Sequence, residues 1–158
     1  MFLTLGNEQE NSKSARFFDT DVFEDRVYMY VAECIMKNGE RKLASDYFIE
    51  KYAKIISLDK GLIPFSLYPY QKKMFEKFAN NRFNIVLACR QSGKSISACG
   101  YLLWFALFQP EKTVVVLANK GATAREMLAR ITIMLENIPF FLQPGCKALN
   151  KSNIDFSN

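Results

Sequence analysis

Ala-Cys-Arg-Gln-Ser-Gly-Lys-Ser, at residues 88–95, is the stretch of this sequence that decides the expected fold. It fits the P-loop pattern G-x-x-x-x-G-K-[ST], with Ala88 standing where the first glycine usually lies. An apolar run at 83–87 precedes it, and a longer apolar run at 96–108 follows it. This is the strand–loop–helix context that the motif requires. The sequence therefore predicts a phosphate-binding loop between a strand and a helix.

The predicted loop has the groups that bind a nucleoside triphosphate. Its backbone N–H groups and the positive end of the following helix would surround the phosphates. Lys94 would reach the β- and γ-phosphates, and the Ser95 hydroxyl would hold Mg²⁺. The alternative is an ordinary turn without a ligand, but a lysine at a helix N-terminus is unfavourable unless an anion compensates its charge. The loop residues expected to contact the nucleotide are Ala88, Cys89, Gln91, Ser92, Gly93, Lys94 and Ser95.

The composition excludes several classes of site. The chain has 158 residues and a net charge of +5, which permits a nucleic-acid partner without demanding one. It contains no histidine, and its four cysteines show no C-x-x-C spacing, so zinc sites and histidine-dependent nucleophiles are not expected. Cys89 and Cys99 flank the loop and are interpreted as buried small residues rather than as a disulfide. Without a signal-peptide pattern or an apolar run of membrane-spanning length, the expected compartment is the cytoplasm.

Residues 1–60 are expected to form a mainly helical segment, which includes a helix at about 43–52 that begins near Ser45 and Asp46. An acidic cluster early in this segment is interpreted as the start of another helix, where the macrodipole favours carboxylates. A metal site is the alternative, although no glycine that would bend the backbone accompanies the acids. The cluster consists of Asp19, Asp21, Glu24 and Asp25.

Residues 61–158 are expected to form part of a P-loop ATPase domain. A helix begins at Pro69, and Thr123–Glu126 has the form of a capping box that opens a later helix. Three consecutive valines within 112–118 are typical of a strand buried on both faces of a parallel sheet. With the strand at 83–87 and a weak strand within 148–156, the order predicts a P-loop NTPase-type three-layer sandwich with a parallel central sheet, incomplete at its end.

Three side chains near the loop suggest further contacts with a nucleotide. The amide of Gln71 offers a donor and an acceptor to an adenine edge, and Tyr70 can stack on the ring. A helix-surface glutamine and a core tyrosine are the alternative interpretation. Arg90 lies inside the loop and could stabilise charge on the transferred phosphoryl group as an arginine finger in cis. A surface arginine on an exposed loop is the alternative.

These segments together resemble the amino-terminal ATPase portion of the large terminase subunit of tailed bacteriophages. Leu67–Lys72 is similar to the family's adenine-recognising segment, and Cys89–Ser95 to its variant Walker A loop, which also carries an early arginine. Leu117–Gly121 resembles the strand and turn that come next, and Phe141–Gly145 the segment after the following helix. The resemblance covers about residues 43–158 and is dense.

The resemblance implies a viral DNA-packaging motor that couples ATP hydrolysis to the translocation of double-stranded DNA into a procapsid. It implies adenine contacts from Tyr70 and Gln71, catalytic roles for Arg90 and Lys94, and Mg²⁺ held by Ser95. The implied partners are double-stranded DNA, a portal protein, a small terminase subunit and other terminase copies. The implied location is the host cytoplasm during virion assembly.

The chain departs from the family pattern after the loop. Water activation needs a carboxylate at the end of a later apolar strand, and Val114–Leu117 runs instead into Ala118-Asn119-Lys120. We therefore expect an amino-terminal fragment that ends before Walker B, has no nuclease domain and hydrolyses ATP poorly. A fragment of a helicase-like nucleic-acid-dependent ATPase is the alternative, but helicases usually have a glycine at the position of Gln91. A third possibility is an interaction fragment with a vestigial loop.

Overall fold

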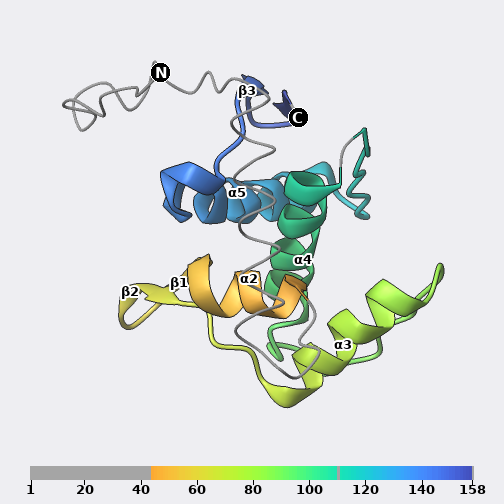
Figure 1. The fold of residues 1–158 in the computed structure, drawn as a ribbon. Coiled ribbons are helices and arrows are strands. Elements are labelled where there is room, and N and C mark those ends of the chain that lie inside the picture. The colour runs from red at the N-terminus through yellow and green to blue at the C-terminus, as the bar shows by residue number, and fades with distance from the viewer. Residues whose placement is uncertain (1–43, 110, 158) are drawn as a thin grey trace.

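The computed structural model describes residues 44–109 and 111–157. Helices dominate this part of the chain, and two short β-hairpins accompany them (Figure 1). The elements in chain order are α2 (Ala44–Tyr52), β1 (Lys54–Ser57), β2 (Gly61–Pro64), α3 (Pro69–Asn80), α4 (Lys94–Phe108), α5 (Gly121–Asn137), the 3₁₀ turn η1 (Phe140–Leu142), β3 (Cys146–Leu149) and β4 (Ile154–Phe156).

Helix α4 is the centre around which the other helices pack. It is apolar on most of its circumference, which is typical of a helix enclosed by protein. Figure 1 shows α5 crossing one end of α4, whereas α2 and α3 lie toward the other end. A Cβ at Gly100 would lie 3.0 Å from Ile49 Cδ1, so the glycine allows α2 to approach α4 closely. Helices α2, α3, α4 and α5 contribute to one apolar core, which includes Phe48, Ile49, Phe75, Cys99, Leu103, Leu107, Met134 and Leu135.

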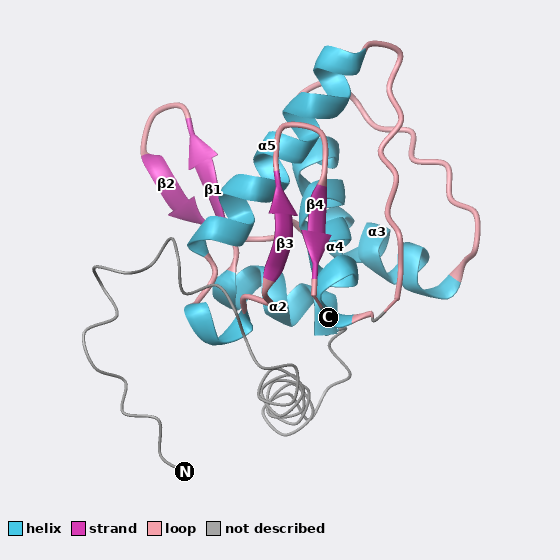
Figure 2. Ribbon diagram, turned by 90° about the horizontal axis from the view of Figure 1, so that it is seen from above, coloured by secondary structure: helices cyan, strands magenta, loops and turns pink. Residues whose placement is uncertain are grey.

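The two sheets are separate antiparallel hairpins. Strand β1 pairs with β2, with Ile56 opposite Leu62, and β3 pairs with β4, with Leu149 opposite Ile154. Figure 2 shows each hairpin as its own two-stranded ribbon, and the segments on either side of α4 as loops. The first hairpin connects α2 to α3 along the chain. Its strand β1 contacts α5, and β2 contacts α2, so residues 54–64 lie close to the helical core.

The predicted parallel three-layer sandwich is therefore wrong for the residues that the structure describes. Neither 83–87 nor 112–118 is a strand, and the described part of the chain has no parallel central sheet. A strand of a parallel sheet depends on partners for its backbone hydrogen bonds and on helices to cover both faces. Here these conditions are not met, and large apolar side chains stand exposed, namely Phe83, Ile85, Leu87, Val115 and Leu117.

The helices agree better with the sequence. Helix α2 matches the expected 43–52, α3 begins at Pro69, and α4 ends at Phe108 as predicted. The capping box was placed wrongly, because α5 begins at Gly121 with Lys120 at its N-cap. The weak strand expected within 148–156 is part of the hairpin β3–β4.

Some expectations fall outside the described residues. The acidic cluster and the helix expected to follow it lie within 1–43, so the structure neither supports nor opposes them. Across the described ranges, no helix is both long and apolar enough to cross a membrane.

Candidate functional site

The loop at 88–95 leads directly into α4, as its motif requires, but the strand that the motif requires before the loop is absent. Gly93 is the N-cap residue, with φ at 80° and ψ at 8°, in the left-handed region that favours glycine. Lys94 and Ser95 occupy the first turn, which contains no acidic residue. The positive end of the helix and the Lys94 ammonium therefore reinforce each other and leave a cationic end for an anion.

Hydrogen bonds within the loop hold it in a tight turn. The Ser92 hydroxyl donates to the Cys89 carbonyl oxygen at 2.9 Å, and Lys94 Nζ donates to the same oxygen at 3.2 Å. Gln91 has φ at 62°, so it adopts the left-handed conformation without being glycine. The Lys94 ammonium thus folds back over the loop.

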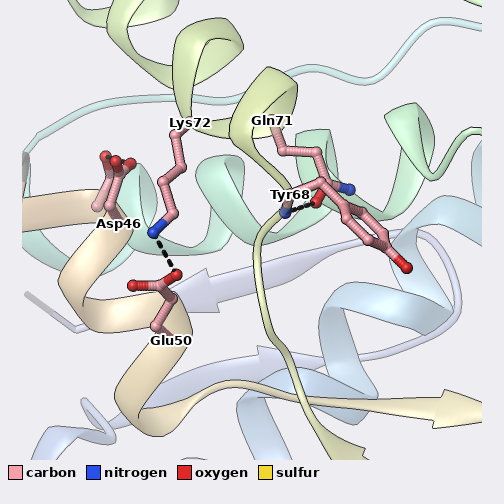
Figure 3. Close-up of polar contacts among 6 residues, drawn as sticks. Asp46, Glu50, Tyr68, Gln71 and Lys72 are labelled. Carbon is pink, nitrogen blue, oxygen red and sulfur yellow. Dashed lines mark hydrogen bonds and ion pairs between the residues drawn. The ribbon is translucent and has the colours of Figure 1, made fainter.

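The start of α3 is joined to this loop by two side chains. Gln71, which is only 2% exposed, donates through Nε2 to Ser97 Oγ at 2.7 Å. Its Oε1 accepts from the Tyr68 N–H at 2.8 Å (Figure 3). The Ser97 hydroxyl in turn donates to the Gly93 carbonyl oxygen at 2.9 Å, and the Tyr70 hydroxyl donates to the carbonyl oxygen of Ser92. These hydrogen bonds therefore connect the start of helix α3 to the last residues of the loop.

An ion pair holds the same end of α3 against α2. Lys72 Nζ lies 2.6 Å from Glu50 Oε1, and both side chains are partly exposed. Figure 3 shows Lys72 pointing from α3 to Glu50, beside the Tyr68–Gln71 contact. Exposed ion pairs contribute little to the free energy of unfolding. This contact between Lys72 and Glu50 is therefore a minor part of what joins α3 to α2.

A cavity of about 630 Å³ adjoins the loop. Its volume falls within the range of pockets for small molecules, roughly 300–1,000 Å³. Strand β1 and the turn after it form one wall, α5 forms another, and the loop with the start of α4 forms a third. The lining residues are Lys54, Ile55, Ile56, Leu58, Gln91, Gly93, Lys94, Ser95, Ile96, Arg130, Ile133 and Met134.

The residues predicted from the sequence are brought together only in part. Tyr70 and Gln71 lie against the end of the loop, and the Gln71 amide bridges Tyr68 and Ser97. Its contact with adenine stays a prediction. Arg90 is exposed on the turn, and its catalytic role stays a prediction as well. Cys89 is exposed and Cys99 is buried, so only one of the two flanking cysteines packs as expected.

Three residues near the loop were missed by sequence reasoning. Ser97 is a polar residue inside the apolar run 96–108, a signal that could have been noticed. Lys54 and Arg130 line the cavity from distant parts of the sequence, and no local pattern marks them. Only the packing of β1 and α5 beside the loop brings them to it.

The predicted metal ligand in the loop is a single hydroxyl group. Ser95 is exposed in the first turn of α4 and offers a hydroxyl oxygen. Mg²⁺ at nucleotide sites is usually held by one or two carboxylates together with phosphate oxygens and waters. Within the described ranges, no group of three or more His, Cys, Asp or Glu side chains is placed to hold a metal ion alone. Ser95 could thus supply one oxygen ligand, whereas no carboxylate is among the described residues that line the adjoining cavity.

Burial beside the loop perturbs one thiol strongly. Burial raises the pKa of Cys99 from 9.0 to about 11, and the nearby Arg130 guanidinium opposes this rise. Cys99 Sγ donates to the Met127 carbonyl oxygen at 3.6 Å, which places the thiol in the contact between α4 and α5. This cysteine is a packing residue rather than a nucleophile.

Comparison with known protein families gives no further identification. No protein-family model matches the chain.

Proposed function

We propose that this chain is the ATP-binding part of a viral DNA-packaging motor of the large-terminase type. Its loop at 88–95 would bind Mg-ATP, and the complete motor would translocate double-stranded DNA into a procapsid in the host cytoplasm. The partners of that motor would be the portal protein, the small terminase subunit and other terminase copies. One observation carries the nucleotide part of this proposal: the P-loop motif lies at the start of α4, with left-handed Gly93 as its N-cap.

The electrostatics of the loop support an anionic ligand. Lys94 stands in the first turn of α4, where the helix dipole is also positive and no acid compensates it. Its ammonium bonds to a single loop carbonyl, that of Cys89. A triphosphate would offer several charged oxygens, which form shorter and stronger hydrogen bonds with an ammonium group than a neutral carbonyl does.

The terminase type is supported by the way two similar segments meet. Leu67–Lys72 and Cys89–Ser95 carry most of the resemblance, and they are separate in sequence. In the structure Tyr70 bonds to Ser92, and Gln71 reaches the loop through Ser97. A segment that recognises a nucleotide and a loop that holds its phosphates would have to adjoin, and the contacts between these two segments support the proposal in this respect.

The same site suggests that hydrolysis by this chain is slow. Lys94, Arg90 and the loop N–H groups would stabilise charge on the phosphates, but attack by water also needs a positioned base. Among the residues that the structure describes, no carboxylate lines the cavity beside the loop. Within the proposal, the chain binds Mg-ATP and hydrolyses it poorly.

Calorimetric titration with Mg-ATP tests the nucleotide part. Wild-type chain should bind one equivalent, and Lys94→Ala should weaken binding at least tenfold, because a charge-assisted contact with phosphate is lost. Lys73→Ala is the matched control, since it removes a positive charge from an exposed position on α3. The proposed function would be contradicted if the wild-type chain did not bind Mg-ATP, or if Lys94→Ala and Lys73→Ala weakened binding equally.

A further inference from the structure

We propose that Lys54 on β1 and Arg130 on α5 form a subsite for the terminal phosphate of the nucleotide, in the cavity that adjoins the loop. This inference rests on the proposed function, because the rest of the nucleotide would lie against α3 and on the loop. The motif at 88–95 includes neither side chain. The ligand class is a nucleoside triphosphate, which the subsite would distinguish from a diphosphate.

The surroundings of the loop end set the direction of a bound nucleotide. Helix α3 lies against the loop end at one place, where Tyr70 donates to the carbonyl oxygen of Ser92 and Gln71 reaches Gly93 through Ser97. The cavity opens elsewhere, beside β1 and α5, and neither Tyr70 nor Gln71 lines it. A nucleotide with its base at α3 and its phosphates along the loop therefore reaches the cavity with its terminal phosphate.

Lys94 belongs both to the loop and to the cavity. Its place in the motif predicts contact with the β- and γ-phosphates. Lys94 also lines the cavity, together with Gly93 and Ser95 from the same end of the loop. A γ-phosphate held by Lys94 thus lies at the loop wall of the cavity, in the space that Lys54 and Arg130 line from the other walls.

The charge of the cavity fits a phosphate group. Among the described residues that line it are three cations, namely Lys54, Lys94 and Arg130, and no acid. Lys54 has no ion-pair partner in the described part of the chain, whereas Arg130 Nη2 lies 2.5 Å from Glu126 Oε1. The lining therefore has an excess of positive charge, which attracts an anion.

The aliphatic walls of the cavity strengthen this attraction. They include Ile55, Ile96, Ile133 and Met134, and Met134 is buried in the core. Apolar walls lower the local dielectric constant, so a cation attracts a phosphate more strongly here than at a fully hydrated surface. The volume of about 630 Å³ is ample for a phosphate group.

The guanidinium of Arg130 can exchange its present partner for a phosphate. Its planar group of N–H donors matches the oxygens of a phosphate as well as those of a carboxylate. The pair with Glu126 spans one turn of α5, and both side chains are partly exposed. Because exposed pairs of this kind are weak, a phosphate that also contacts Lys94 can replace the carboxylate.

Paired calorimetric titrations with Mg-ATP and Mg-ADP test the proposal, because the two nucleotides differ only in the terminal phosphate. Arg130→Gln should weaken Mg-ATP binding about tenfold, the loss expected for a hydrogen bond between charged groups, and should change Mg-ADP binding less than twofold. Arg125→Gln is the matched control, since it removes the same charge from α5 at a residue that lines a different cavity. It should change both affinities less than twofold.

Lys54→Gln provides a second variant at an exposed position, where the substitution leaves the core intact. It should weaken Mg-ATP binding severalfold and change Mg-ADP binding less than twofold. Lys60→Gln is its control, because Lys60 is exposed in the turn of the same hairpin and does not line the cavity. It should leave the preference for Mg-ATP over Mg-ADP unchanged.

Glu126→Gln tests the exchange of partners at Arg130. The substitution releases the guanidinium from its present ion pair, so the affinity for Mg-ATP should rise relative to that for Mg-ADP. The same substitution in an Arg130→Gln background should have no such effect. A rise of equal size in both backgrounds would contradict the role of Arg130.

The outcomes separate the two proposals. If the wild-type chain binds neither nucleotide, the proposed function fails. If both nucleotides bind in a Lys94-dependent manner with equal affinity, the nucleotide function stands and the terminal-phosphate subsite is wrong. The subsite is also wrong if Arg130→Gln and Lys54→Gln change the affinities for Mg-ATP and Mg-ADP by the same factor.

Discussion

Gln71 and Ser97 form a buried hydrogen bond of 2.7 Å between helices α3 and α4. The Ser97 hydroxyl in turn donates a hydrogen bond to the carbonyl oxygen of Gly93, the last residue before α4. This chain of bonds sets the position of the loop end relative to α3. Any ligand that moves Gly93 must therefore also move or break the Gln71 contact.

Removing either partner of this bond should destabilise the fold. Gln71→Ala and Ser97→Ala each leave a buried polar group without its partner, which costs about 1–3 kcal/mol. Urea unfolding of both single variants and the double variant gives their coupling. Contacting residues couple by about 0.5–3 kcal/mol; strictly additive losses would mean that the bond contributes nothing.

Two glycine substitutions separate backbone strain from the contact with Gln71. Gly93 and Gly61 both have positive φ, at 80° and 67°. A Cβ at Gly93 would meet Gln71 Nε2 at 3.0 Å, whereas nothing lies within 4 Å at Gly61. Gly61→Ala should cost the left-handed strain alone, about 1–2 kcal/mol, and Gly93→Ala should cost more.

The excess cost at Gly93 should depend on Gln71. In a Gln71→Ala background, which removes the crowded amide, Gly93→Ala should lower the free energy of unfolding only as much as Gly61→Ala does. Equal costs for the two glycine substitutions in the wild-type background would show that the loop end does not press on Gln71.

The Cys99 thiol predicts a loss of stability in alkali. Burial raises its pKa from 9.0 to about 11, so between these values the unfolded chain releases a proton that the folded chain keeps. The free energy of unfolding should therefore fall as pH rises from 9 to 11. Burial also raises the pKa of Tyr101, so the part that belongs to the thiol is the difference between wild type and Cys99→Ala.

Thiol labelling provides an independent check on the same residue. Exposed Cys89 should react with a disulfide reagent at pH 8 in the native chain, whereas Cys99 should react only after unfolding, because the thiolate is the nucleophile. Peptide mapping distinguishes the two sites. Equal reactivity of Cys89 and Cys99 would contradict the buried position of Cys99.

Arg90 should affect hydrolysis and not binding. Its side chain is exposed on the turn, and the proposed role is to stabilise charge that develops on the transferred phosphoryl group. Arg90→Ala should thus change Mg-ATP affinity less than twofold in this chain. In a full-length motor it should lower kcat with little effect on KM. A loss of binding as large as that of Lys94→Ala would exclude the finger role.

Helices were predictable here because their hydrogen bonds are local. Pro69 marked the start of α3, and the apolar run after Lys94 marked α4. The predicted strands at 83–87 and 112–118 are absent from the structure. β-Propensity alone cannot supply the neighbouring strand that completes backbone hydrogen bonding. The hairpin β1–β2 was not predicted, although Gly61 lies between the apolar pairs Ile55–Ile56 and Leu62–Ile63.

The candidate site, like the fold, was predictable only where its geometry depends on local sequence. The motif predicted the loop residues and their place at a helix N-terminus, because the pattern itself encodes that local geometry. It could not predict that Ser97 would connect Gln71 to Gly93, nor that Lys54 and Arg130 would line the adjoining cavity. Those relationships arise from tertiary packing between segments that are distant in sequence.

Thermal unfolding with and without Mg-ATP tests the central claim most directly. Nucleotide at about a hundredfold over Kd should add about 2.7 kcal/mol to the free energy of unfolding, which raises Tm by roughly 5–10 °C for a domain of this size. Lys94→Ala, whose affinity should be at least tenfold weaker, should show at most about half of this rise under the same conditions. An unchanged Tm in the wild type, or an equal rise in Lys94→Ala, would contradict nucleotide binding at the loop.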